Sequence, residues 1–120
     1  MVRSAAETDE SARDPRLRGR TYQVPYALVW DEILHMISTL PRWDLLQADE
    51  ASGVIRAQAT NRLLRFANAV VVRVKLDRNA LTRVDVRSTS PLGRVVVGNN
   101  ARLISWFLGA LDHRLGLDQR

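Results

Sequence analysis

The sequence predicts a two-layer α+β fold, in which an antiparallel sheet of about five strands carries two amphipathic helices on one face. Apolar residues recur at the 3.6-residue period of a helix over residues 25–40 and 101–115. Between these segments they recur at the two-residue period of antiparallel strands that have one buried and one solvated face. The expected order is strand, helix, four strands, helix (β-α-β-β-β-β-α), a layout similar to helix-grip proteins.

Residues 1–20 are polar and mixed in charge, with almost nothing to bury. They are expected to form a disordered tail ahead of a single domain at residues 21–118. The tail lacks the apolar segment of a signal peptide, which favours a cytoplasmic location, or a periplasmic one if a leader has been removed. No apolar run approaches the roughly 18 residues that a membrane-spanning helix needs.

A short strand at residues 21–24 is expected to lead into the first helix. Pro25 stands at a position where helices tolerate proline, and Pro41 ends the helix. His35 lies on the polar face, as expected of an exposed surface histidine. The apolar face of the helix consists of Tyr26, Val29, Trp30, Ile33, Met36, Ile37 and Leu40.

Four further strands are expected after this helix, at residues 43–48, 54–61, 69–77 and 81–88. A turn centred on Ala80 between the last two would place opposite charges across from each other. The pairs would be Lys75 with Asp85 and Asp77 with Arg83. In this arrangement one surface of the sheet is formed by Val70, Val72, Val74, Val84 and Val86.

The last helix, from about residue 101 to 115, is expected to supply the main core contact. Ile104, Phe107 and Leu111 recur at helical spacing and are expected to face the valines of the sheet. They form either a filled core or the lining of a hydrophobic pocket. Trp106 lies at the border of the apolar face, as a rim residue of the core or as a contact patch. The candidate pocket or core residues are Val72, Val84, Ile104, Phe107 and Leu111.

The residues that catalysis or metal binding needs are scarce in this sequence. There is no cysteine, and the two histidines, His35 and His113, lie on the polar faces of different helices. The carboxylate pairs at residues 31–32 and 49–50 diverge on a helix or lie in a turn, so neither suits acid–base chemistry. The sequence therefore predicts a protein that is not an enzyme and has no metal and no cofactor.

The formal net charge is +5, and residues 53–94 hold nine basic and two acidic residues. Such a segment can attract phosphate or an acidic surface. Single-strand binders add aromatic platforms to a basic groove, and Phe66 is the one aromatic residue in this stretch. Nucleic acid is therefore an unlikely partner, and a solvated sheet face is the expected role of this charge.

Three short runs of sequence resemble a known family: Arg62-Leu63-Leu64-Arg65-Phe66, Val86-Arg87-Ser88-Thr89-Ser90 and Gly98-Asn99-Asn100-Ala101-Arg102. Together with Trp30 and the ending Leu40-Pro41-Arg42, they resemble the domain of unknown function 1499 family, which is uncharacterised and occurs in bacteria and plastids. The chain departs from the pattern at Asn68, Ala69 and Val96, where relatives usually carry acidic residues. A polar or cation site built on those acids would be absent here.

The resemblance also directs attention to polar residues at one end of the sheet. Asn100 can cap the last helix, and Arg102 can pair with a sheet residue. The residues that can meet as a candidate polar cluster are Arg65, Asn68, Ser88, Asn100 and Arg102.

Three functional hypotheses follow. The first is a non-enzymatic module that binds a hydrophobic small molecule between helix and sheet, or a protein partner that can be a second copy of the chain. The second is a structural or assembly subunit with a filled core. The third is an anion or nucleic-acid binder that uses the basic sheet face. A cavity beside Phe107 would favour a ligand in the first hypothesis, whereas a filled core with an exposed apolar patch would favour the second.

Overall fold

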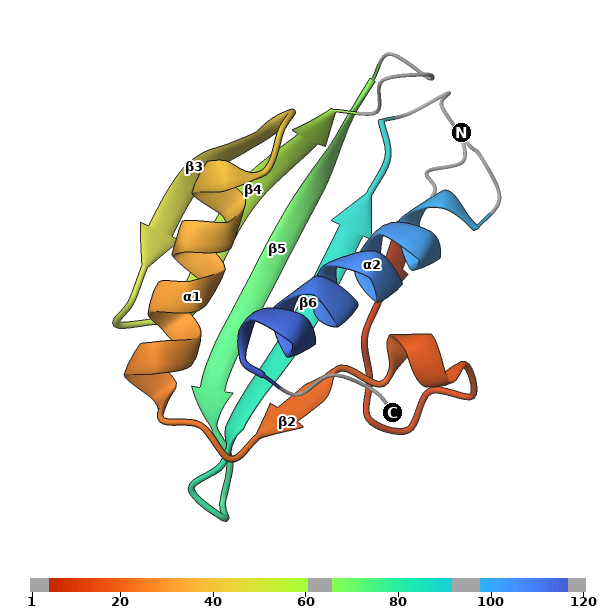
Figure 1. Ribbon diagram of the computed structural model, residues 1–120. Coiled ribbons are helices and arrows are strands. Elements are labelled where there is room, and N and C mark those ends of the chain that lie inside the picture. The colour runs from red at the N-terminus through yellow and green to blue at the C-terminus, as the bar shows by residue number, and fades with distance from the viewer. Residues whose placement is uncertain (1–4, 61–65, 92–97, 117–120) are drawn as a thin grey trace.

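The computed structural model describes residues 5–60, 66–91 and 98–116, which form an antiparallel six-stranded sheet and two α-helices (Figure 1). The strands follow the order β1-β6-β5-β4-β3, and β2 pairs with β6 beside β1. The predicted α+β class is therefore confirmed. The elements are β1 (Ala5–Glu7), the 3-10 helix η1 (Pro15–Leu17), β2 (Arg20–Tyr22), α1 (Tyr26–Thr39), β3 (Trp43–Asp49), β4 (Val54–Thr60), β5 (Ala67–Leu76), β6 (Thr82–Thr89) and α2 (Asn99–Arg114).

Both α-helices lie on the same face of the sheet, α1 toward β3 and α2 toward β6 and β1 (Figure 1). Helix α1 begins after Pro25, whose carbonyl accepts hydrogen bonds from the amides of Leu28 and Val29. It ends at Leu40, which is extended because a residue before proline is disfavoured in the α conformation. The predicted apolar face is buried at Val29, Trp30, Ile33, Met36 and Ile37.

The core lies between the two helices and the valines of β5 and β6. Val72 is paired with Val86 and Val74 with Val84, so the valine surface is continuous across the two strands. The α2 stripe packs on it, and its residues Ile104, Phe107 and Leu111 have no exposed surface. The regular alternation of the strands is what places these side chains on one face.

The register of the β5–β6 hairpin differs from the prediction by two residues. Asp85 is paired with Arg73 and Arg83 with Lys75. The loop is centred on residue 79 because the Asp77 carboxylate accepts hydrogen bonds from the amides of Asn79 and Leu81. Ala80 completes the turn with a φ of 62°. A shift of two keeps every valine on the buried face, so the hydrophobic pattern alone cannot exclude it.

The prediction of a disordered tail is wrong for residues 5–20. Strand β1 pairs with β6, and the buried Thr8 hydroxyl donates to Asp85 at 2.7 Å while it accepts from the amide of Val86 at 2.9 Å. The Arg83 guanidinium donates to the carbonyl of Arg18 at 2.6 Å. Because polar and backbone bonds hold this segment, its low apolar content does not prevent folding. The domain therefore includes residues ahead of position 21, and its predicted end at residue 118 lies outside the described residues.

Asp112 occupies a buried position on α2 although helical periodicity assigns it to the polar face. Its carboxylate accepts hydrogen bonds from the Tyr22 hydroxyl at 2.6 Å and from Arg20 Nε at 3.0 Å. Burial and this hydrogen bond raise the pKa of the Tyr22 hydroxyl. The hydrogen bonds of Asp112 with Arg20 and Tyr22 connect the end of α2 to β2, so they stabilise the fold.

Candidate functional site

Four buried polar side chains connect the start of α2 to the start of β5 and the end of β6. The Ser88 hydroxyl donates to Asn100 Oδ1 at 2.6 Å, and Asn100 Nδ2 donates to Ser90 Oγ at 2.9 Å. The Ser90 hydroxyl in turn donates to Asn68 Oδ1 at 3.2 Å. All four residues are almost completely buried. This polar network joins three elements where the valine core ends.

The structure brings three of the predicted cluster residues together, namely Asn68, Ser88 and Asn100. Asn100 does not cap α2, because the cap residue is Gly98, whose φ is 80°, and Asn100 lies inside the first turn. Arg102 is exposed and stands outside the network, and its side chain has no hydrogen bond or ion pair to any residue in the described ranges. Arg65 and Val96 lie outside those ranges.

Ser90 is the member of the network that sequence reasoning missed. The buried positions of β6 are Thr82, Val84, Val86 and Ser88, and the same alternation continues to Ser90 just after the strand. Extending the period-2 pattern by one step would have found it.

Asn100→Ala is expected to lower the free energy of unfolding by about 1–3 kcal/mol, since it leaves buried polar partners in Ser88 and Ser90 without their bonds. Urea denaturation followed by circular dichroism measures the loss. Ser38→Ala, which removes an exposed hydroxyl on α1, is the control and should change stability by less than about 0.5 kcal/mol. Equal effects of the two substitutions would mean that the network does not brace the helix.

Beside the network, a groove of about 260 Å³ opens between the start of β3, the end of β4 and the first half of α2. Its α2 side consists of residues at positions 99, 102, 103 and 106, a spacing that places them on one face of the helix. Small side chains of the sheet leave the space open. We call this the tryptophan groove, and its lining residues are Trp43, Ala59, Thr60, Asn68, Asn99, Arg102, Leu103 and Trp106.

Two tryptophans form the apolar part of the tryptophan groove. The Trp43 ring stacks on Phe107 with a centroid separation of 5.4 Å and meets the Trp106 ring at 6.4 Å with a tilt of 37°. Trp106 is 51% exposed, so it lies at the surface and not inside the core. Trp43 was not singled out from the sequence, because the first residue of a strand after a helix gives no periodic signal.

The polar part of the tryptophan groove offers hydrogen-bond donors. Asn99 Nδ2 is buried and has no hydrogen-bond partner within the described residues. Such an unsatisfied donor costs about 1–3 kcal/mol, so an acceptor at this position is stabilising. Arg102 adds a cation, and the described lining residues include no acid.

The interior between α2 and the sheet is filled. Val72, Val84, Ile104, Phe107 and Leu111 all have no exposed surface, and none of them lines the tryptophan groove. These five residues therefore form core in the structure, and a ligand held between helix and sheet would have to displace them.

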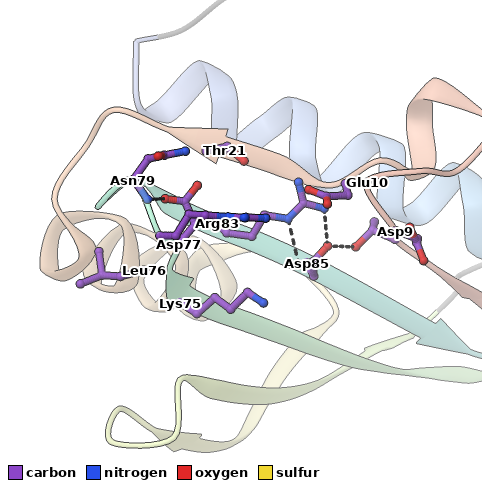
Figure 2. Close-up of a pocket in the computed structure, with 11 residues that line it drawn as sticks. Asp9, Glu10, Thr21, Lys75, Leu76, Asp77, Asn79, Arg83 and Asp85 are labelled. Atoms are coloured by element: carbon purple, nitrogen blue, oxygen red, sulfur yellow. Dashed lines mark hydrogen bonds and ion pairs between the residues drawn. The ribbon is translucent and has the colours of Figure 1, made fainter.

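A larger cavity of about 610 Å³ lies on the opposite face, at the tip of the β5–β6 hairpin (Figure 2). The Arg83 guanidinium is 2.8 Å from the Asp85 carboxylate, and the Asp77 carboxylate accepts a hydrogen bond from the Asn79 amide within its own turn; both interactions are drawn in Figure 2. The Arg83 and Asp85 charges are thus bonded to each other, and the Asp77 carboxylate is bonded to backbone amides. Since no aromatic side chain is among its described lining residues, this cavity is a weaker candidate for a ligand site.

The basic charge predicted for the sheet lies on its uncovered face, at Arg56, Arg73 and Arg87. Across the strands Arg73 is opposite Asp85, and Arg87 is 3.6 Å from Glu7. Acidic residues therefore partly neutralise the positive charge of this face, which weakens it as a binding surface for the phosphates of a nucleic acid.

Within the described ranges no cluster of three or more residues is arranged as metal ligands. Neither helix of that part of the chain combines the length and the hydropathy that a membrane crossing requires.

The structure defines a two-layer α+β domain with a filled core, a polar network at one end of the sheet and a groove beside that network. Over residues 2–111 the chain matches the family described as protein of unknown function, DUF1499, and it belongs to that family. The match includes most of the segment that the composition assigns to a tail. Among the curated proteins compared with the chain, none matches it.

Proposed function

We propose that this domain is a non-enzymatic binding module, and that the tryptophan groove holds an apolar group of its ligand. The observation that carries the proposal is the pair Trp43 and Trp106, which line an open groove at the edge of a filled core. Large apolar rings contribute much of the binding energy in ligand sites and interfaces. The ligand is not held beside Phe107, where no space is left.

The assembly hypothesis has weaker support. Strand β3 is an edge of the sheet, and its Leu45 and Leu46 are exposed. However, the register of β3 shifts between Leu45 and Gln47, and the strand carries the exposed acids Asp44 and Asp49. Bulges and charges are the features by which proteins prevent edge-to-edge pairing. The tryptophan groove is therefore the better candidate for recognition.

The test is a titration of the ¹⁵N-labelled protein with 2-naphthaleneacetamide, a neutral two-ring probe. The indole N–H signals of Trp43 and Trp106 are expected to shift, whereas that of Trp30, which is buried in α1, should stay unchanged. Trp106→Ala should weaken binding by about tenfold, because loss of a stacking ring typically costs about 1–3 kcal/mol.

Leu28→Ala is the matched control, since Leu28 is similarly exposed but lies on α1 away from the groove. It should leave the affinity for the probe unchanged. If neither this probe nor its acid shifts the signals of Trp43 and Trp106 at millimolar concentration, the proposed function is wrong.

A further inference from the structure

We infer that the tryptophan groove selects a monoanion, in which a planar apolar group carries a single carboxylate. The inference rests on the proposed function and adds the chemical class of the ligand. The planar group would lie against Trp43 and Trp106, and the carboxylate would accept hydrogen bonds from Arg102 and Asn99.

Arg102 is the first reason to expect an anion. It is exposed and lines the groove, and its guanidinium has no ion pair or hydrogen bond within the described ranges. Arg16, Arg20, Arg83 and Arg114 each form an ion pair with an acid, so their charge is not available to a ligand in the same way. A guanidinium presents paired N–H donors whose geometry matches a carboxylate.

Asn99 is the second and independent reason. Its Nδ2 is buried without a partner in the described part of the chain, and it lines the same groove. An amide nitrogen only donates, so the group that satisfies it must be an acceptor. Asn99 Nδ2 and the Arg102 guanidinium are thus both donors that require an acceptor, and a carboxylate has two oxygens that can accept from them.

The position of the guanidinium places the two donors at the same end of the groove. Arg102 Nη1 lies 3.4 Å from where a side-chain carbon on Gly98 would stand, so the arginine folds back toward the start of α2. Asn99 is the next residue after Gly98. Trp106 lies about one helical turn beyond Arg102 and two turns beyond Asn99 along α2, which separates an anion end from an aromatic end.

The charge and size of the groove favour a small monoanion. Arg102 is the one cation among its described lining residues, so a doubly charged phosphate would be only half neutralised. A volume of about 260 Å³ is slightly below that of most ligand sites, which commonly range from about 300 to 1,000 Å³. A group of one or two fused rings with a short acidic arm suits this space.

A free aromatic acid and the C-terminal aromatic residue of another protein share this chemistry. The two sources are distinguished by comparing 2-naphthaleneacetate with the peptide N-acetyl-Gly-Gly-Phe, which ends in a free carboxylate. Tighter binding of the peptide points to a chain terminus, and tighter binding of the naphthalene acid points to a small molecule. In either case the carboxylate must be required.

The experiment compares the affinities of 2-naphthaleneacetate and 2-naphthaleneacetamide by the same indole N–H shifts. In the unmodified protein the acid is expected to bind about tenfold tighter than the amide, as a charge-assisted hydrogen bond to arginine predicts. Arg102→Gln should abolish this preference, so that the acid and the amide bind to this variant with similar affinities. Arg73→Gln removes the same charge from the opposite face and should retain the preference.

Equal affinities for acid and amide, with both probes shifting Trp106, would overturn the inference and leave the proposed function intact. A tenfold preference that persists in Arg102→Gln would overturn it as well, because the anion would then be bound elsewhere. Since Arg102 is exposed, the variant is expected to fold, and its unchanged Trp30 signal verifies this in the same spectra.

Discussion

Replacing Phe107 with alanine is expected to lower the free energy of unfolding by about 3–5 kcal/mol, a large part of the stability of a small domain. Phe107 has no exposed surface and packs between α2 and the valines of β5 and β6. It also supports the ring of Trp43, on which it stacks at 5.4 Å. Urea denaturation followed by circular dichroism gives the change in stability.

Leu28→Ala is the control for this substitution, because it truncates an apolar side chain that is 57% exposed. It should change stability by less than about 0.5 kcal/mol. If Phe107→Ala is as mild as Leu28→Ala, the interior beside α2 is hollow enough to tolerate the truncation, contrary to a filled core.

Removal of residues 2–18 is expected to destabilise the domain by about 2 kcal/mol or more. The deletion eliminates the two hydrogen bonds of the Thr8 hydroxyl, each worth about 1 kcal/mol, and it exposes the part of β6 that β1 covers. Thermal unfolding of the shortened and the full chain gives the shift in midpoint.

Thr8→Val tests the same contact within the full chain, since it keeps the shape of the side chain but not its hydroxyl. It should reproduce part of the loss and leave β1 in place. An unchanged midpoint after the deletion would mean that residues 5–18 contribute nothing to stability and that their packing on β6 is wrong.

The elements that periodicity defines could be predicted from the sequence. The valines of β5 and β6 and the α2 stripe at Ile104, Phe107 and Leu111 give an unambiguous pattern, because burial on one face requires it. The N-terminal segment could not be predicted, because the hydrogen bonds that Thr8 and Arg83 make to hold it span 77 and 65 residues of sequence. Hydrogen bonds between distant polar residues leave no periodic trace.

The candidate site was predicted only in part for the same reason. Polar residues near the ends of strands and at a helix start suggested that Asn68, Ser88 and Asn100 meet, and they do. The tryptophan groove depends on where α2 crosses the sheet, which the sequence does not specify. Trp43 and Asn99 acquire their roles only from that crossing.

The most direct test of a filled core with an external binding groove is a crystal structure of the protein soaked with 2-naphthaleneacetate. The two rings are expected between Trp43 and Trp106, with the carboxylate within hydrogen-bond distance of Arg102 and Asn99 Nδ2. A naphthalene ring found beside Phe107, between α2 and the valine surface, would contradict the account.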